Sequence, residues 1–563
     1  MSSTSRAAPA AVLVLALNGA PALAQVLPPD IGTTIREIEQ RRPEVPPERR
    51  PSLQVEQPAR PALQAPPDAR FPVQGFRITG ASAFPSAELL PLVHEFEGRD
   101  LGLADLEQAA ARITDFYRER GYLVARAYVP AQEITSGEVE IAVLEGRFGA
   151  LELRNTSRLS DDLVRDTLGE AATGAVIRQA PLERELLLLK DLAGVATAAT
   201  LKPGAEVGTS DLVVAITPTR TFTGTLEADN YGNRYTGSLR LGGSVAAANL
   251  AGRGDLLSVR GLVTEETDLW YGRAAYQVPV SGNGLRLGGA FSRTYYTLGR
   301  QFAALDANGN ANIYSLFGVY PAIRSTRGNL DAQLTLDYLD LDDQVNAADT
   351  FNRRWIRSSS LGLNGNVRDD LLGGGVNAAS VAYVNGYLQF RDEAAFLIDQ
   401  RTTQSAGSFD KVAYSALRLQ RFTDMLQLYL GIQGQFAGKN LDPSQKFVLG
   451  GPNGVRAYPQ GEGVGDDGFL GTAELRYALP PWTWLARPQV FAFFDGGTIR
   501  INQDQFRAGL NRVSQYGAGI GANLLFAGGF SLRGSVAWRI GSEPVPGVSN
   551  ASSQGWIQLV KFF

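Results

Sequence analysis

Apolar and polar residues alternate along most of the last two thirds of the chain, from about Thr221 to Phe563. Alternation with a period of two places successive side chains on opposite faces, as in a β-strand that separates two different environments. Leu334–Tyr338 and Leu426–Leu430 show it clearly. The region divides into sixteen such runs, of about ten residues each, which is typical of a closed barrel in a membrane.

The connections between these runs differ in length from one rim to the other. Every second connection is short, namely 249–254, 281–283, 422–425 and 527–529. The others are longer, such as 298–311, 339–353, 389–408 and 438–467. Outer-membrane barrels have short turns at one rim and long loops at the other, whereas a soluble β-sandwich or propeller does not. We therefore expect a mainly β protein whose residues 221–563 form a sixteen-stranded antiparallel transmembrane β-barrel in a Gram-negative outer membrane.

Residues 71–220 have a different pattern, in which strand-like runs alternate with helical ones. An amphipathic helix over Leu103–Arg120 ends at Gly121, and a second over Leu182–Leu192 ends before Gly194. Each belongs to a unit of β-α-α-β-β order. The pattern predicts two small α+β domains, over residues 71–146 and 147–220.

The N-terminal segment divides into three parts. Residues 1–24 carry Arg6, a short apolar run and the small residues Ala22 and Ala24, which is typical of a cleaved signal peptide. Residues 25–42 contain a short helical pattern with Ile31, Ile35 and Ile38 on one face. Residues 43–70 are rich in proline and predict an extended, poorly folded linker.

Composition excludes several kinds of chemistry. The chain has no cysteine and one histidine, His94, so disulfides, thiolate ligands and most histidine-dependent catalysis are excluded. Its net charge of -4 gives no reason to expect nucleic acid. No Walker-type nucleotide loop and no Ser/His/acid set are present. We expect neither a cofactor nor a metal, and no enzymatic activity.

The longest predicted loop and a strand that follows it carry an unusual pair of charges. Gly450 and Gly451 allow tight turns in the loop, and Arg456 follows among apolar residues. Asp495 lies within an aromatic strand. A carboxylate facing lipid is costly, so Asp495 should face the lumen, where Arg456 is its natural partner.

These segments resemble the motifs of a known family, the outer-membrane transporters of two-partner secretion (the TpsB, or haemolysin activator and filamentous haemagglutinin transporter, family). The family's loop motif, V-R-G-Y/F, is matched by Val455, Arg456 and Tyr458, with Ala457 in place of the usual glycine. Its strand motif, F-x-x-F-D-x-G, is matched at 491–497 by Phe491, Phe494, Asp495 and Gly497.

The resemblance extends over nearly the whole mature chain. It implies that the two α+β domains are POTRA domains and that residues 25–42 form a plug helix, with residues 43–70 as its tether. The C-terminal Phe563 resembles a barrel-insertion signal, although Lys561 interrupts the apolar row of the last strand.

The resemblance also implies a function. POTRA domains in the periplasm would capture an unfolded cognate exoprotein, a β-helical protein of the TpsA type, by strand addition, and the barrel would export it to the cell surface. Pairing of Arg456 with Asp495 would lock the long loop in its active position. The other partners implied are outer-membrane lipid, lipopolysaccharide and the barrel-assembly machinery.

Other functions remain open at this stage. A barrel-assembly or insertion factor of the same superfamily is the first alternative, but such factors usually carry more POTRA domains. A passive porin is the second, but it would need no periplasmic domains. The sequence does not identify the cargo, which could be an adhesin, a cytolysin or a haem-acquisition protein.

Overall fold

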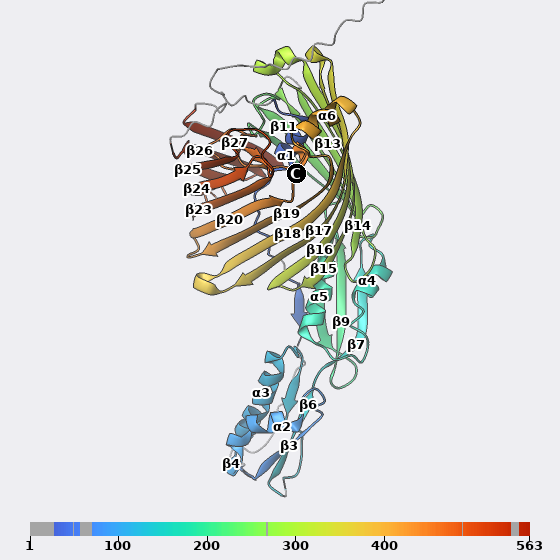
Figure 1. The fold of residues 1–563 in the computed structure, drawn as a ribbon. Coiled ribbons are helices and arrows are strands. Elements are labelled where there is room, and N and C mark those ends of the chain that lie inside the picture. Colours follow the sequence, from blue (N-terminus) through green and yellow to red (C-terminus); the bar gives the residue numbers. More distant parts are fainter. Residues whose placement is uncertain are drawn as a thin grey trace, which may run out of the picture.

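The computed structural model describes residues 28–48, 50–56, 70–134, 136–265, 268–486, 488–541 and 551–563. A wide barrel lies at one end of the molecule, and two small domains follow one another away from one of its rims (Figure 1). The predicted signal peptide, residues 1–24, lies outside the described residues. Among the residues described, no helix has the length and apolar character needed to cross a membrane.

The barrel is a closed sheet of sixteen strands, which confirms the predicted fold. Each strand is antiparallel to the next, and the first pairs with the last. The strands are β10 (Phe222–Asp229), β11 (Arg240–Ala248), β12 (Leu256–Thr264), β13 (Leu269–Pro279), β14 (Arg286–Thr297), β15 (Ala307–Arg324), β16 (Gly328–Val345), β17 (Thr350–Asp369), β18 (Gly375–Phe390), β19 (Gly407–Arg421), β20 (Leu426–Ala437), β23 (Asp467–Ala478), β24 (Gln489–Arg500), β25 (Arg512–Phe526), β26 (Phe530–Arg539) and β27 (Ser553–Phe562).

Strands β15 to β18 are longer than the sequence predicts, at 16 to 20 residues each. The expectation of a long loop over 339–353 is therefore wrong, because β16 and β17 leave only residues 346–349 between them. Likewise, β15 begins within the predicted loop 298–311. The added part of β16 is rich in aspartate, but Leu339 and Leu341 are buried within the lumenal core around the N-terminal helix. This packing keeps a loop-like sequence in strand conformation.

Helix α1 (Ile31–Glu39) lies inside the barrel (Figure 1). The Asp30 side chain caps it by accepting a hydrogen bond from the Thr33 amide at 2.8 Å. The linker after the helix is only partly unstructured, because β1 (Leu53–Val55) pairs in parallel with β8 of the second small domain. The prediction of a poorly folded linker is wrong for this segment, although its backbone is extended as predicted and forms the edge of a sheet.

The first small domain contains β2 (Phe71–Val73), β3 (Gly75–Thr79), α2 (Ser86–Leu89), β4 (Arg99–Leu101), α3 (Leu103–Glu119), β5 (Arg126–Tyr128) and β6 (Glu138–Leu144). Its sheet has the order β3-β6-β5. The second contains β7 (Arg147–Asn155), α4 (Asp161–Thr167), α5 (Gln179–Lys190), β8 (Val195–Pro203) and β9 (Thr209–Pro218), with the sheet order β1-β8-β9-β7. Each domain has its own hydrophobic core beneath its helices.

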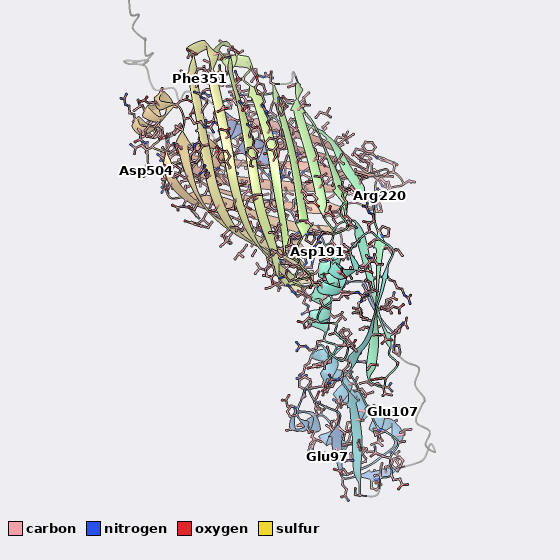
Figure 2. The ribbon with its side chains drawn as sticks, turned by 90° about the vertical axis from the view of Figure 1, so that its right-hand side faces the viewer. Glu97, Glu107, Asp191, Arg220, Phe351 and Asp504 are labelled. Atoms are coloured by element: carbon pink, nitrogen blue, oxygen red, sulfur yellow. The ribbon has the colours of Figure 1, made fainter. Side chains whose placement is uncertain are left out.

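The second small domain is bonded to the turns at one barrel rim. The Arg184 guanidinium donates to the Pro321 carbonyl at 3.0 Å, and the Ser160 amide donates to the Gly252 carbonyl at 2.8 Å. Asp191, which Figure 2 labels at the junction between the domain and the barrel, forms an ion pair with Arg324. The domain is thereby held against the rim from which a polypeptide could enter the barrel.

Candidate functional site

The connection between β20 and β23, residues 438–466, folds back into the barrel and is called the long loop below. It contains the one-turn helix η7 (Pro443–Gln445) and a short hairpin of β21 (Phe447–Val448) and β22 (Val464–Gly465). Its base is organised by Asp466, which is fully buried. The Asp466 carboxylate accepts hydrogen bonds from the Leu441 amide at 3.0 Å and the Gln503 amide at 2.8 Å.

The loop places Arg456 against Asp495 on the inner face of β24. The Arg456 Nε and Nη2 atoms donate to the two carboxylate oxygens of Asp495 at 2.7 and 2.9 Å. The Arg456 amide donates to the same carboxylate at 3.2 Å. Both residues are almost completely buried, at 1% and 0% exposure. This two-point geometry is the strong form of a guanidinium–carboxylate pair.

Three further residues contact Arg456. Glu474 on β23 accepts from its Nη1 atom at 2.7 Å, and the ring of Phe493 lies 3.2 Å from its guanidinium carbon. The Trp556 indole on the last strand donates to the Arg456 carbonyl at 2.8 Å. No sequence motif assigns these three residues to the site. Glu474 carried a usable signal, since it is an acid inside an alternating strand, as Asp495 is.

The other residues of the loop motif shape the backbone around this pair. A side chain at Gly450 would meet the Glu462 carbonyl at 2.6 Å, and Gly451 has a φ of +122°, which favours glycine. Val455 is fully buried in a second lumenal cluster, which includes Leu449 and Phe491. Tyr458 is also buried, and the guanidinium of Arg539 lies 4.4 Å from the centre of its ring.

The residues of the wall motif point to different sides of β24. Phe491 is buried in the lumen, whereas Phe494 is 46% exposed on the outer face. The period of two explains this division, because 491, 493 and 495 share the inner face. Gly497 lies where a side chain would meet the Leu449 side chain at 2.5 Å, so it makes room for the loop.

Ala457, which replaces the usual glycine of the motif, fits a space left on the wall. It is 1% exposed, and a side-chain carbon built on Gly517 of β25 would lie 2.5 Å from the Ala457 methyl carbon. The absence of a side chain at Gly517 therefore accommodates the extra methyl group at 457.

The predicted apolar face of the plug helix is buried in the lumen. Ile31, Ile35 and Ile38 are 0%, 3% and 9% exposed, and they belong to one core with lumenal side chains that include Tyr271 and Leu341. Gly32 packs on the long loop, where a side-chain carbon would lie 2.4 Å from the Ser444 amide nitrogen. The helix therefore fills the barrel together with the loop.

The C-terminal residue lies at the closing seam of the barrel. The amide of Phe563 donates to the Gly224 carbonyl, and the Gly224 amide donates back to the Phe563 carbonyl, both at 3.1 Å. Lys561 extends to the rim, where its ammonium bonds to the Gly528 carbonyl and lies 4.4 Å from the centre of the Phe530 ring. Its charge is thus kept at the edge of the apolar row.

Two family models match the chain. A model described as "POTRA domain, ShlB-type" matches residues 71–146. A model described as "Haemolysin secretion/activation protein ShlB/FhaC/HecB" matches residues 208–524, which is more than half of the chain.

Relatives and solved structures are similar over most of their length. The chain is 29% identical over 544 residues to the haem/hemopexin transporter protein HuxB of Haemophilus influenzae, covering 95% of each protein. The structure of CdiB from Escherichia coli has a TM-score of 0.71 at 20% identity, covering 90% of this chain and 93% of that one. CdiB from Acinetobacter baumannii has a TM-score of 0.62 at 17% identity, covering 92% and 95%. At these identities the two structures support the fold.

Proposed function

This chain belongs to the ShlB/FhaC/HecB family of haemolysin secretion and activation proteins, and from that premise we propose how its parts act in export. The protein is an outer-membrane translocator of two-partner secretion, with its POTRA domains in the periplasm. We assign residues 71–146 and 147–220 to the two POTRA domains, 25–42 to the segment of the plug helix, within which α1 covers Ile31–Glu39, and 221–563 to the barrel. A cognate exoprotein is its partner, and the family is one of transporters. We propose that the chain has no enzymatic activity of its own.

The proposed lock between Arg456 and Asp495 carries the mechanism. The long loop occupies the lumen, and its buried arginine has all its side-chain contacts on the wall strands β23 and β24. Two unit charges about 4 Å apart interact by about 4 kcal/mol at an effective dielectric constant of 20. We assign to this contact the task of holding the loop in the position that export requires.

We further propose that cargo is captured by strand addition at the outer edge of β3, the other terminal strand of the first POTRA sheet, which in the described part of the chain pairs only with β6. The edge of β5 is already engaged by α3, because the Ala127 amide donates to the Thr114 hydroxyl at 2.9 Å, and the β8 edge of the second POTRA domain is covered by β1. An exposed edge offers unpaired amides and carbonyls to an extended chain. An unfolded exoprotein has such a backbone whatever its sequence.

A haem-acquiring exoprotein is the first cargo class to test. HuxB, the relative that is similar over 95% of the chain, is named as a haem/hemopexin transporter protein. Lipid and lipopolysaccharide would contact the outer apolar face, and we propose that Phe563 guides insertion by the barrel-assembly machinery.

The function is tested by expressing the protein with its candidate exoprotein in a host that lacks both. We expect the exoprotein in the medium only when the full chain is present. Deletion of residues 71–146 should leave the barrel in the membrane and abolish release. Release without the transporter, or with the deletion variant, would contradict the proposal. Insertion of other barrels that depends on this chain would favour the assembly-factor alternative.

A further inference from the structure

The segment that follows the plug helix contributes a second arginine to the lock. The Arg42 Nη1 atom donates to Glu474 Oε1 at 3.0 Å, and its Nη2 atom lies 3.5 Å from Asp495 Oδ2. The Arg42 side chain is only 10% exposed. The same two carboxylates therefore bind one arginine from the long loop and one from residues 31–42, which we call the plug segment.

Arg42 also bonds to the loop itself. Its Nη2 atom donates to the carbonyl of Gly454, two residues before Arg456, at 2.9 Å. This contact can exist only while the loop is folded into the lumen. Arg456 keeps both of its side-chain bonds to Asp495 with Arg42 present, so Arg42 does not displace it.

The rest of the plug segment is bonded to the loop in the same way. The side-chain Nε2 atom of Gln40 donates to the Val448 carbonyl at 3.0 Å, and the Asn453 side chain donates to the backbone carbonyl of Gln40 at 2.9 Å. Arg36 donates to the Lys446 carbonyl at 3.1 Å. Plug and loop thus form one hydrogen-bonded body within the barrel.

The arrangement of charges around Glu474 and Asp495 allows the plug segment to separate from the long loop. Arg476 binds the second oxygen of Glu474 at 2.7 Å. When Arg42 leaves with the plug, Arg456 and Arg476 still balance the two carboxylates. Withdrawal of the plug therefore leaves Glu474 and Asp495 each with an arginine partner, but it removes the bond to the loop tip.

We propose that Arg42 couples the position of the plug helix to the lock of the long loop, so that release of either segment loosens the other. The inference rests on the proposed lock between Arg456 and Asp495. Coupling between two sites is reciprocal, since each must change the other's equilibrium by the same factor. In this proposal, the lock holds the plug helix as well as the long loop.

Single cysteines measure both positions, because the natural chain has none. Thr34, 1% exposed, reports on the plug, and Val448, 4% exposed, reports on the loop. Each is replaced by cysteine in the full-length protein in the outer membrane, and its rate of reaction with a membrane-impermeant maleimide is measured. We expect Arg42→Gln to raise the rate at position 448 about tenfold, and Arg456→Gln to raise the rate at position 34 about tenfold.

The neighbouring Arg41 is the matched control, because it is exposed and carries the same charge. Arg41→Gln should change neither rate, and Arg42→Lys should fall between wild type and Arg42→Gln. Heat-modifiable migration on gels establishes that each barrel is folded. An unchanged or slower rate at position 448 in Arg42→Gln overturns the coupling. An unchanged rate at 448 in Arg456→Gln overturns the lock itself, so the two failures are distinguishable.

Discussion

At the residue scale, burial of the Arg456 guanidinium makes its contact with Asp495 decide between two positions of the long loop. It is 1% exposed, and its bonds to Asp495 and Glu474 replace the water that it loses. Removing one partner of a buried ion pair costs about 3–5 kcal/mol, because the other charge is left without a partner. A loop held in this way is either fully in place or displaced.

The first prediction concerns this pair. Arg456→Ala should leave the barrel abundant in the membrane but reduce export strongly, because the loop loses its own bonds to both wall carboxylates and Asp495 keeps only the longer arginine contact, with Arg42, at 3.5 Å. Loss of one partner of a buried ion pair costs about 3–5 kcal/mol. The amounts of barrel and of released exoprotein are measured side by side by immunoblot. Arg507→Ala, at an exposed position, is the control. Unchanged export by Arg456→Ala would contradict the lock.

A second prediction at this scale concerns Glu185 in the second POTRA domain. Its side chain is buried, and burial raises its pKa from 4.5 to about 7. Since the folded-state pKa exceeds the unfolded one, the folded domain binds the proton more tightly. Stability should be highest below pH 4.5 and should fall as the pH rises through about 7, by at most about 3 kcal/mol.

Glu185→Gln should remove this pH dependence. Amide hydrogen exchange in α5 of the full-length protein, measured at pH 5 and pH 8, checks it. The variant should exchange more slowly than wild type at pH 8 and similarly at pH 5. Glu206→Gln, an exposed acid of the same domain, should show no such difference. Equal protection of wild type and Glu185→Gln at pH 8 would argue against a destabilising carboxylate.

At the element scale, the plug helix is held by its surroundings more than by its own sequence. A helix of nine residues is marginal in water, and this one contains a glycine and two threonines. Its stability comes from the three buried isoleucines and from the capping bond of Asp30. Docking and folding of the helix are therefore one event.

Gly32→Ala tests this view, because two effects oppose each other. Helix propensity alone favours alanine by about 1 kcal/mol. The added methyl group, however, would lie 2.4 Å from the backbone nitrogen of Ser444, which cannot move without the loop. We expect the plug to leave more often, with higher conductance in planar bilayers. Thr33→Ala, on a less buried side of the helix, is the control, and a quieter pore in Gly32→Ala would contradict the prediction.

Most elements of the fold could be predicted from the sequence, because each has a local signal. The barrel strands show alternating apolar and polar residues, and the POTRA helices show apolar residues that recur with a period of 3.6. The long β16 could not be predicted, because its aspartate-rich end is stabilised by packing of Leu339 and Leu341 in the lumenal core. The strand β1 could not be predicted either, because it is stabilised by pairing with β8, which lies more than a hundred residues away in the sequence.

The candidate site follows the same division. Asp495 could be predicted, because a carboxylate inside an aromatic strand is costly in lipid and should face the lumen. Arg456 could then be predicted as the cation that pairs with it. Arg42 could not, because it lies among prolines and charged residues in which nothing marks one arginine as buried. Its role depends on where the plug helix ends in space, and a contact between residues 42 and 474 has no local signature.

At the scale of the whole molecule, the second POTRA domain is bonded to the barrel rim, so that the domain and the rim turns can move together. The Asp191–Arg324 ion pair is mostly buried, with both side chains 9% exposed. Backbone and side-chain bonds to the rim turns, such as that between Arg184 and Pro321, add to it. The strand β1 also ties this domain to the segment that enters the lumen.

Asp191→Asn should loosen this attachment, because it leaves Arg324 with reduced compensation in a mostly buried place. Spin labels at exposed positions 162 and 351 report the distance between the POTRA domain and the far end of the barrel. We expect a broader distance distribution in the variant. Glu206→Gln should leave the distribution unchanged, and an equally narrow distribution for Asp191→Asn would show that the other contacts suffice.

The fit between Ala457 and Gly517 links two positions that lie far apart in the sequence, so that the residue at one should limit the size tolerated at the other. An alanine at 517 alone would force the loop outward, whereas the exchange of both, Ala457→Gly with Gly517→Ala, keeps the total volume and should recover export in a secretion assay. Recovery no better than with Gly517→Ala alone would contradict this. Relatives that retain glycine in the loop are free to carry a larger residue on the wall, so the two sites should covary across the family.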